Sequence, residues 1–593
     1  MGTWPSPTVP LPWSAVSATL QAQEAHDEVR MSGDTLQAQA ELVRRRAADL
    51  AGELSRSARR TATIAQERAV LRMLGVNGLD RAGRPLAASI AERYCGSDRR
   101  RLARGVILPF VAAMLEYDLP ARDLALDVAA GAIDLGLEAE LLERPDRLAA
   151  AEKRAGAMID AALVRFDANR TVSRDMREVL GLPEEPWLGV ALQATEVLSA
   201  VAEIRGLVDQ GTDVVAVRVP ASWEFAEARR RAGLETSDLF EFEDRDRRRT
   251  GDRGGGRGGR GTGGATQSRA VRGRRRPQAT RPEAEQVPAG SQRGLASLRK
   301  ATDDAAARRG CYASLMTVAS AFAAPEQAVV AAFERIDYVV GDPIREIVED
   351  NVDPERALAD HAFAHRLQAR AGCRVVIGSG PLALGADVAS GLPSDAATRS
   401  GRGLALQALG VELALADGLP PDRLFLGAVP DWVGAEGVPA SILIEAWLRS
   451  LVFHGHRLVV SGPAARTSAP GRPAGLVSAL AGGLASLVIQ PAAVDRVDVV
   501  AADLGAAAAA SRAIRATLAD GQLHGEAADV ADRTLRAASA VLERLAAEGW
   551  ESLLGPRGQG DGDDGGLERL GASAVVERAD GLTSGARLLQ VLG

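Results

Sequence analysis

The side chains best suited to chemistry follow short apolar runs that are typical of buried strands. Ser461 ends one such run, and Arg466 follows it in SGPAAR, so a hydroxyl and a guanidinium could bind a substrate there. Another run, 374–379, continues into GSGP, whose backbone N–H groups could meet a phosphate. A plain tight turn fits GSGP about equally well, so both interpretations stay open.

Residue types that carry metal or imine chemistry are scarce. His454 and His456 flank a glycine and could ligate a metal, but no cysteine or carboxylate lies nearby, which favours a solvated loop. The three cysteines are too scattered for a zinc site or a disulfide framework. Of 71 basic residues only Lys153 and Lys300 are lysines, and neither is well placed for a Schiff base. We therefore predict no metal site.

The composition is that of a soluble globular protein, with 593 residues, 46% hydrophobic and 25% charged. No run of 18 or more purely apolar residues could span a bilayer. The N-terminus lacks a charged segment followed by an apolar one, so no secretory signal is evident. The predicted location is the cytoplasm, without a membrane partner.

The elements that must position these residues begin with the stretch 187–220. It contains two continuously apolar runs, WLGVAL and DVVAVRV, joined by a segment whose apolar residues recur at helical spacing. Continuously apolar strands are buried on both faces, as in a parallel sheet. The stretch therefore predicts a strand–helix–strand unit, with more such units to follow.

Strand-like and helical segments alternate through the rest of this region, which predicts a TIM (β/α)₈ barrel, an α/β fold with its site at the C-terminal strand ends. A doubly wound sheet is the alternative. The eight strand-like runs are 187–193, 213–219, 312–319, 336–340, 374–379, 423–429, 457–461 and 484–490.

Helical patterns flank the barrel on both sides. One of them, 61–79, predicts a helix that Gly75 closes. The predicted division is a disordered N-terminus (1–20), a helical accessory region (21–182), the barrel (183–491), C-terminal helices (492–555) and a Gly/Asp-rich tail (556–593).

An Arg/Gly-rich insert, 245–290, interrupts the barrel after its second strand. Within 245–281 there are 13 arginines against two aspartates and no apolar periodicity, so we predict disorder. Arginines could neutralise RNA phosphates, but the insert lacks interleaved aromatic residues, so nucleic acid is not the favoured partner.

Several stretches carry a resemblance to a known family. They are ERAVLRMLGVNGLD, GTDVVAV, APEQAVVAAFERID, NVDPERALADHAF and ADGLPPDRLFLG, and they occur in the family's order. The chain resembles the α subunits of lysine 5,6-aminomutase, an isomerase that uses adenosylcobalamin and pyridoxal 5′-phosphate. The resemblance implies radical 1,2-amino migration on lysine, β-lysine or a related diamino acid.

The resemblance also implies a partner. In the family, a β subunit binds cobalamin through an Asp-x-His-x-x-Gly motif and supplies the lysine that forms the pyridoxal imine. This chain lacks that motif and has few lysines. It is therefore expected to hold pyridoxal phosphate at the barrel mouth and to work with a cobalamin-binding partner.

The resemblance implies site residues by position. Arg218 and Ser222 lie where the family binds the cofactor phosphate, if a gap is allowed. Val318 lies where the family stacks a Tyr on the pyridine ring, and Asn351 lies where it has a substrate-binding Asp. Valine cannot stack and asparagine cannot carry the charge. The alternative is therefore a catalytically degenerate homologue that serves as a scaffold or binds another ligand.

Overall fold

The predicted barrel is confirmed. In the computed structural model eight parallel strands pair in chain order, and the first pairs with the last, so the sheet is closed. Closure excludes the doubly wound alternative. The described residues are 33–81, 83–96, 98–185, 187–193, 197–218, 292–318, 321–378, 396–428, 448–449, 451–453, 456–461, 487–491, 526–554, 569–570 and 575–577.

All eight predicted runs form the strands of this barrel. The register closes with Trp187 opposite Leu487 and Ala191 opposite Pro491. The strands are β2 (Trp187–Gln193), β3 (Val214–Arg218), β4 (Ser314–Val318), β5 (Tyr338–Val340), β6 (Arg374–Ile377), β7 (Leu424–Ala428), β8 (Arg457–Ser461) and β9 (Leu487–Pro491).

Alternate strand residues point into the barrel and fill it. At the N-terminal ends of the strands three aromatic rings meet, with centroids 5.3 Å apart for Tyr338 and Phe425 and 6.4 Å apart for Trp187 and Tyr338. The Arg374 guanidinium lies 5.0 Å from the Tyr338 ring centroid. This end of the barrel is therefore closed by large side chains, as a packed core requires.

Helices cover the outside of the barrel because each parallel crossover needs one. Their apolar faces pack on the outward strand residues. These helices are α10 (Val197–Asp209), α13 (Gln292–Arg309), α14 (Ala324–Glu334), α15 (Pro343–Val348), α16 (Pro354–Ala371) and α18 (Ala396–Ala416), with the 3₁₀ turn η3 (Pro421–Arg423) before β7.

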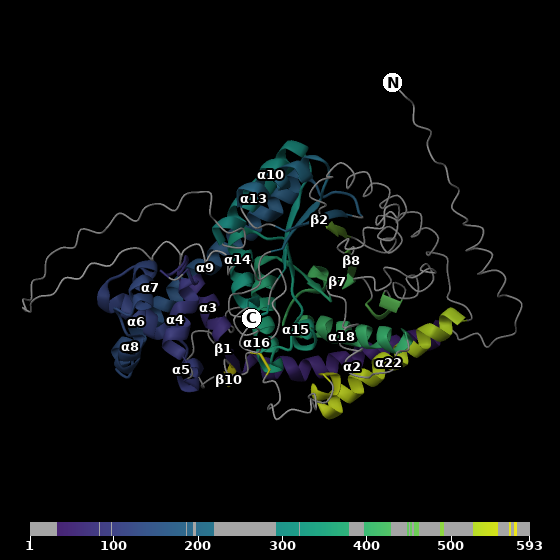
Figure 1. Ribbon diagram of the computed structural model, residues 1–593, viewed down its shortest axis with the longest axis horizontal. Coiled ribbons are helices and arrows are strands. Elements are labelled where there is room, and N and C mark those ends of the chain that lie inside the picture. Colours follow the sequence, from purple (N-terminus) through teal and green to yellow (C-terminus); the bar gives the residue numbers. More distant parts are fainter. Residues whose placement is uncertain are drawn as a thin grey trace, which may run out of the picture.

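Helices α3 to α9 form a group beside the barrel, and they share a hydrophobic core with the barrel helices α14 and α16 (Figure 1). The long α9 leads from this group into the barrel. The group comprises α3 (Ile64–Met73), α4 (Leu86–Cys95), α5 (Arg99–Arg104), α6 (Ile107–Tyr117), α7 (Ala121–Ala130), α8 (Leu135–Leu141) and α9 (Pro145–Leu180).

The first described helix and the long helix that follows the barrel pack together against it. α2 (Gly33–Arg59) and α22 (Glu526–Glu548) pack side by side on α18, and the short α23 (Glu551–Leu554) follows α22 (Figure 1). No helix within the described ranges is long and apolar enough to cross a membrane.

The predicted helix at 61–79 is wrong at its start. Residues 61–63 form the strand β1 (Thr61–Thr63), which pairs antiparallel with β10 (Val575–Glu577) near the other end of the chain. Its partner lies so far away in sequence that local periodicity cannot reveal the pairing. The helix does end where Gly75 predicts, because this glycine has a φ of 94°. Residues 1–20 and 245–290 lie outside the described residues, so their disorder stays a prediction.

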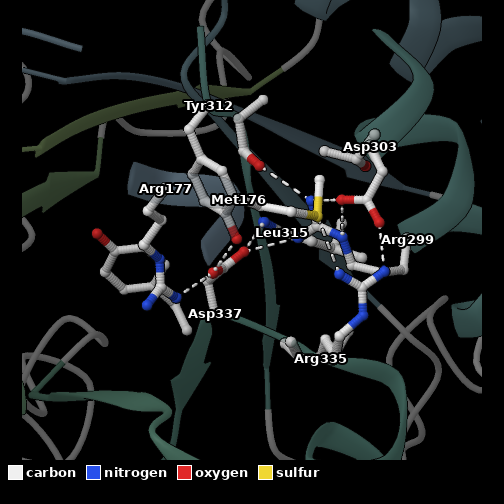
Figure 2. A network of polar contacts seen from close by, with 12 residues as sticks. Met176, Arg177, Arg299, Asp303, Tyr312, Leu315, Arg335 and Asp337 are labelled. Atoms are coloured by element: carbon white, nitrogen blue, oxygen red, sulfur yellow. Dashed lines mark hydrogen bonds and ion pairs between the residues drawn. The ribbon is translucent and has the colours of Figure 1, made fainter. Parts of the chain in front are cut away.

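A buried carboxylate joins the elements at the N-terminal face of the barrel. Asp337 precedes β5, and its oxygens accept hydrogen bonds from Arg177 (2.6 Å), Arg299 (2.7 Å) and the Tyr312 hydroxyl (2.7 Å) (Figure 2). Asp337 also accepts the backbone N–H of Leu315 in β4. Helices α9 and α13 and two neighbouring strands are therefore held by one side chain.

The surroundings of Asp337 keep it ionised. Burial alone would raise its pKa, but the guanidinium groups of Arg299 and Arg177 and the Tyr312 hydrogen bond outweigh burial and lower the pKa to about 2. Asp303 extends the network, because it binds both Arg299 and Arg335 (Figure 2).

Asp337→Asn should lower the free energy of unfolding by about 3–5 kcal/mol, because it leaves buried guanidinium groups without their charge partner. The pKa is lowered in the folded state, so the stability that the carboxylate contributes is present above about pH 4 and is lost as the pH falls toward about 2. Chemical denaturation at several pH values measures both effects. Asp304→Asn, at an exposed pair with Lys300, should cost under about 1 kcal/mol. Equal losses in the two variants would contradict the prediction.

Candidate functional site

The C-terminal ends of the eight strands meet at one face of the barrel, which we call the mouth. In parallel barrels this face carries the site, because the loops that follow the strands converge there. The last strand residues are Gln193, Arg218, Val318, Val340, Ile377, Ala428, Ser461 and Pro491.

Two predicted site residues lie at the mouth by backbone position. Arg218 ends β3 opposite Gln193, and Ser461 ends β8 opposite Ile489. The structure therefore brings these two predicted positions to the same face of the barrel. Ser222 and Arg466, which follow them in the sequence, lie outside the described residues.

Val318 lies on the floor of the mouth. It ends β4 opposite Val340, is partly buried, and packs on the cluster of inward-facing residues together with Ala191. Val318 and Ala191 therefore present aliphatic side chains there. Such a surface excludes water and can contact the face of a flat ligand, but it offers no aromatic ring.

Asn351 lies between α15 and α16 and is joined to the C-terminal segment. Its carbonyl accepts the N–H of Leu570 at 3.1 Å, and Asp353 N–H donates to the Leu570 carbonyl at 3.0 Å. Asn351 also has a φ of 52°, a left-handed conformation that asparagine tolerates better than most residues. The described contacts thus give Asn351 a backbone role, and its role in substrate binding stays a prediction.

A buried polar cluster, not found from the sequence, holds the loop that follows β4. Phe322 in this loop has a φ of 67°, which is a strained conformation for a bulky residue. The Arg68 guanidinium donates to the Phe322 carbonyl at 2.7 Å, and the Arg356 guanidinium lies 3.7 Å from the centroid of the Phe322 ring. Arg68 also binds Glu326 at 3.0 Å. Helices α3 and α16 therefore hold the strained turn from two sides.

The same cluster contains groups with shifted pKa values. Asp360 is 1% exposed, and burial raises its pKa to about 6, although Arg356 and the hydroxyl hydrogen bond from Thr63 oppose this shift. His361 Nε2 lies 3.1 Å from Glu346 Oε1. Burial alone would lower the pKa of His361, but the charge and hydrogen bond of Glu346 raise it. Burial and charge thus shift the pKa values of both Asp360 and His361 upward.

The signal for this cluster was weak in the sequence. Arg356 and Asp360 lie one turn apart in DPERALAD, which indicates only a helix that begins after a cap. Arginine is so common in this chain that the sequence does not distinguish a buried arginine from an exposed one. Within the described ranges, no three His, Cys, Asp or Glu side chains are grouped as metal ligands.

A family profile and two known proteins that resemble this chain all belong to the same protein family. A sequence profile described as the D-lysine 5,6-aminomutase TIM-barrel domain of alpha subunit matches residues 35–222 and 289–431, which is more than half of the chain. Two proteins named lysine 5,6-aminomutase alpha subunit are also similar. The one from Fusobacterium nucleatum is 25% identical over 366 residues, and the one from Acetoanaerobium sticklandii is 23% identical over 365 residues.

The match to these relatives is partial. Each alignment covers 62% of this chain, and it covers 59% of the Fusobacterium protein and 58% of the Acetoanaerobium protein. The chain therefore spans about three fifths of the length of the curated relatives that it matches.

Asp360→Asn should change how stability depends on pH. The folded state raises the pKa of Asp360 from 3.8 to about 6, so it binds a proton more tightly than the unfolded state does. In the unsubstituted protein, protonated Asp360 should therefore increase the free energy of unfolding at low pH. This contribution should be lost as the pH rises from about 4 to about 6. Asparagine cannot titrate and keeps a hydrogen-bond acceptor for Thr63. The stability difference between the two proteins, measured by denaturation, should shift over this window in favour of the variant by an amount on the order of 3 kcal/mol. A difference that does not vary with pH would refute this.

Proposed function

Because the chain belongs to the family of lysine 5,6-aminomutase α subunits, we propose that it is the barrel subunit of an aminomutase. The substrate class is lysine, β-lysine or a related diamino acid, in which an amino group moves to the neighbouring carbon. The observation that carries the proposal is that the family's barrel profile matches this chain from α2 to the residues just after β7, across a barrel that closes as the profile's description requires.

The proposed cofactors divide between two subunits. Pyridoxal 5′-phosphate is assigned to the mouth, where Arg218 and Ser222 would bind its phosphate and Val318 would contact its ring. This fit is supported by the position of Arg218 at a strand end and by the water-excluding floor around Val318. When bound, the cofactor supplies a carbonyl that can hold the migrating amino group.

A partner must supply the lysine that holds the cofactor. This chain has two lysines, and both lie on helices outside the strands: Lys153 is exposed on α9, and Lys300 pairs with Asp304 on the exposed face of α13. A cobalamin-binding β subunit is the proposed partner, and adenosylcobalamin would enter with it.

The residues of this chain would act by binding and orientation. The aliphatic floor would keep water from the reacting face of the ligand, which protects a radical from side reactions. Ser461 and Arg466 would bind the substrate from the β8 side, and Asn351 would meet its ammonium group. The Arg68–Phe322–Arg356 contacts hold the loop after β4 in one conformation.

A catalytically degenerate homologue is the second candidate function. The observation that favours it is Val318 at the end of β4, since a valine offers no aromatic ring to a pyridine. Such a chain would still bind the partner, and it would act as a scaffold or bind another ligand at the mouth.

Co-purification with the cobalamin-binding partner distinguishes the two functions. The aminomutase function predicts a visible spectrum with both cobalamin and pyridoxal absorbance, and isomerisation of lysine or β-lysine. A spectrum with cobalamin alone, after incubation with excess pyridoxal phosphate, would instead establish the degenerate function.

Val318→Tyr should strengthen pyridoxal phosphate binding to this complex. A stacked ring contributes about 0.5–1.5 kcal/mol beyond its buried area, which corresponds to roughly two- to tenfold in the dissociation constant. Val318→Leu is the matched control, because it adds volume without an aromatic ring, and it should give no such gain. Titration followed by absorbance measures both. Equal effects of Tyr and Leu would place the cofactor ring away from Val318.

A further inference from the structure

Asp342 joins the exit of β5 to the exit of β6. It lies two residues beyond β5 and is 3% exposed. One carboxylate oxygen accepts the N–H of Ile344 at 2.9 Å and so caps α15, and the other accepts the N–H of Gly378 at 2.8 Å. The Gly378 N–H is therefore already bonded within the protein and does not point at a phosphate. This favours the interpretation of GSGP as a turn at this residue.

Gln407 joins the exit of β6 to that of β7. It lies on α18 and is fully buried. Its side-chain N–H₂ group donates to the carbonyl of Ile377 at 3.1 Å and to the carbonyl of Gly427 at 2.7 Å. Two buried side chains thus connect three successive strands at the mouth.

Two glycines make this arrangement possible. Gly378 has a φ of 80°, and a Cβ there would lie 2.5 Å from Gln407 Nε2. A Cβ on Gly410 would lie 2.8 Å from Ile377 Cγ2 and 3.3 Å from Asp342 Oδ1, so this glycine lets α18 approach the end of β6. The close packing leaves the strand ends little freedom to shift.

We propose that Asp342 and Gln407 are positioning residues that fix the C-terminal ends of β5, β6 and β7 at the mouth. This rests on the proposed function, since the mouth is where cofactor and substrate would bind. A site must be held within a fraction of an ångström to bind its ligand in one geometry. Neither side chain touches the ligand in this proposal, because both act through backbone groups of the strand ends.

The test compares three variants of the full chain in complex with its partner. Asp342→Asn keeps an oxygen that can cap α15 but cannot accept both N–H groups at once. Gln407→Met keeps the side-chain volume and removes both donated hydrogen bonds. It tests the same proposal if Asp342→Asn does not fold. Asp337→Asn is the control, because it weakens the opposite end of the same strand, β5, at the N-terminal face.

The first readout is the dissociation constant of pyridoxal phosphate, measured at a temperature where all three variants are folded. We expect it to rise about tenfold or more in Asp342→Asn and Gln407→Met, and to stay unchanged in Asp337→Asn. A dissociation constant that follows the melting temperature in all three variants, or that stays unchanged in all three, would overturn the proposal.

The second readout does not depend on the cofactor. Amide hydrogen exchange at 377–378 and 427–428, divided by the exchange at the N-terminal residues of the same strands, should be roughly tenfold faster in the two mouth variants than in the unsubstituted complex, whereas Asp337→Asn should not raise this ratio. If the unsubstituted complex binds no pyridoxal phosphate, the proposed function fails, and the exchange rates alone decide the positioning role. Unchanged exchange at these strand ends would overturn it.

Discussion

The carboxylate of Asp337 is the interaction on which the barrel most depends. It draws two guanidinium groups, a phenol and a strand N–H to one point at the N-terminal face, and these come from α9, α13 and the segments around β4. A buried charge is costly unless it is paired on every side, and here it is. The N-terminal face is stabilised by ion pairs and filled by aromatic rings. The barrel can therefore stay closed while the opposite face carries loops. The separation of a stable face from a functional one follows from this arrangement.

The sequence was sufficient to predict the barrel, because buried parallel strands are continuously apolar and their spacing by helices is regular. It was not sufficient where contacts join distant residues. The strand at 61–63 has three residues and a partner at 575–577, so no local pattern marks it. The ion pairs of Arg68, Arg177 and Arg299 were also missed, because buried and exposed arginines look alike in the sequence.

The candidate site was predictable only in part, for a physical reason. The ends of strands follow from the strands themselves, so the strand pattern could predict that Ser461 lies at the mouth, whereas Arg218 and Val318 came from family resemblance and also lie at strand ends. Residues that act through backbone groups, such as Asp342 and Gln407, have no motif, since any carboxylate or amide of the right reach would serve. The position of Asn351 came from family resemblance, and its observed contacts are with Leu570 near the C-terminus.

The pairing of β1 with β10 has a consequence for how the protein is made. β1 lies between α2 and α3, and its partner β10 follows the whole barrel in the sequence. The helices before the barrel can pack during synthesis, but the edge of β1 and the faces of α2 and α18 that α22 covers must wait exposed. The nascent protein therefore carries an open strand edge and apolar surface until α22 and β10 have been synthesised. Chaperones that shield such surfaces would be needed longest at β1 and α2.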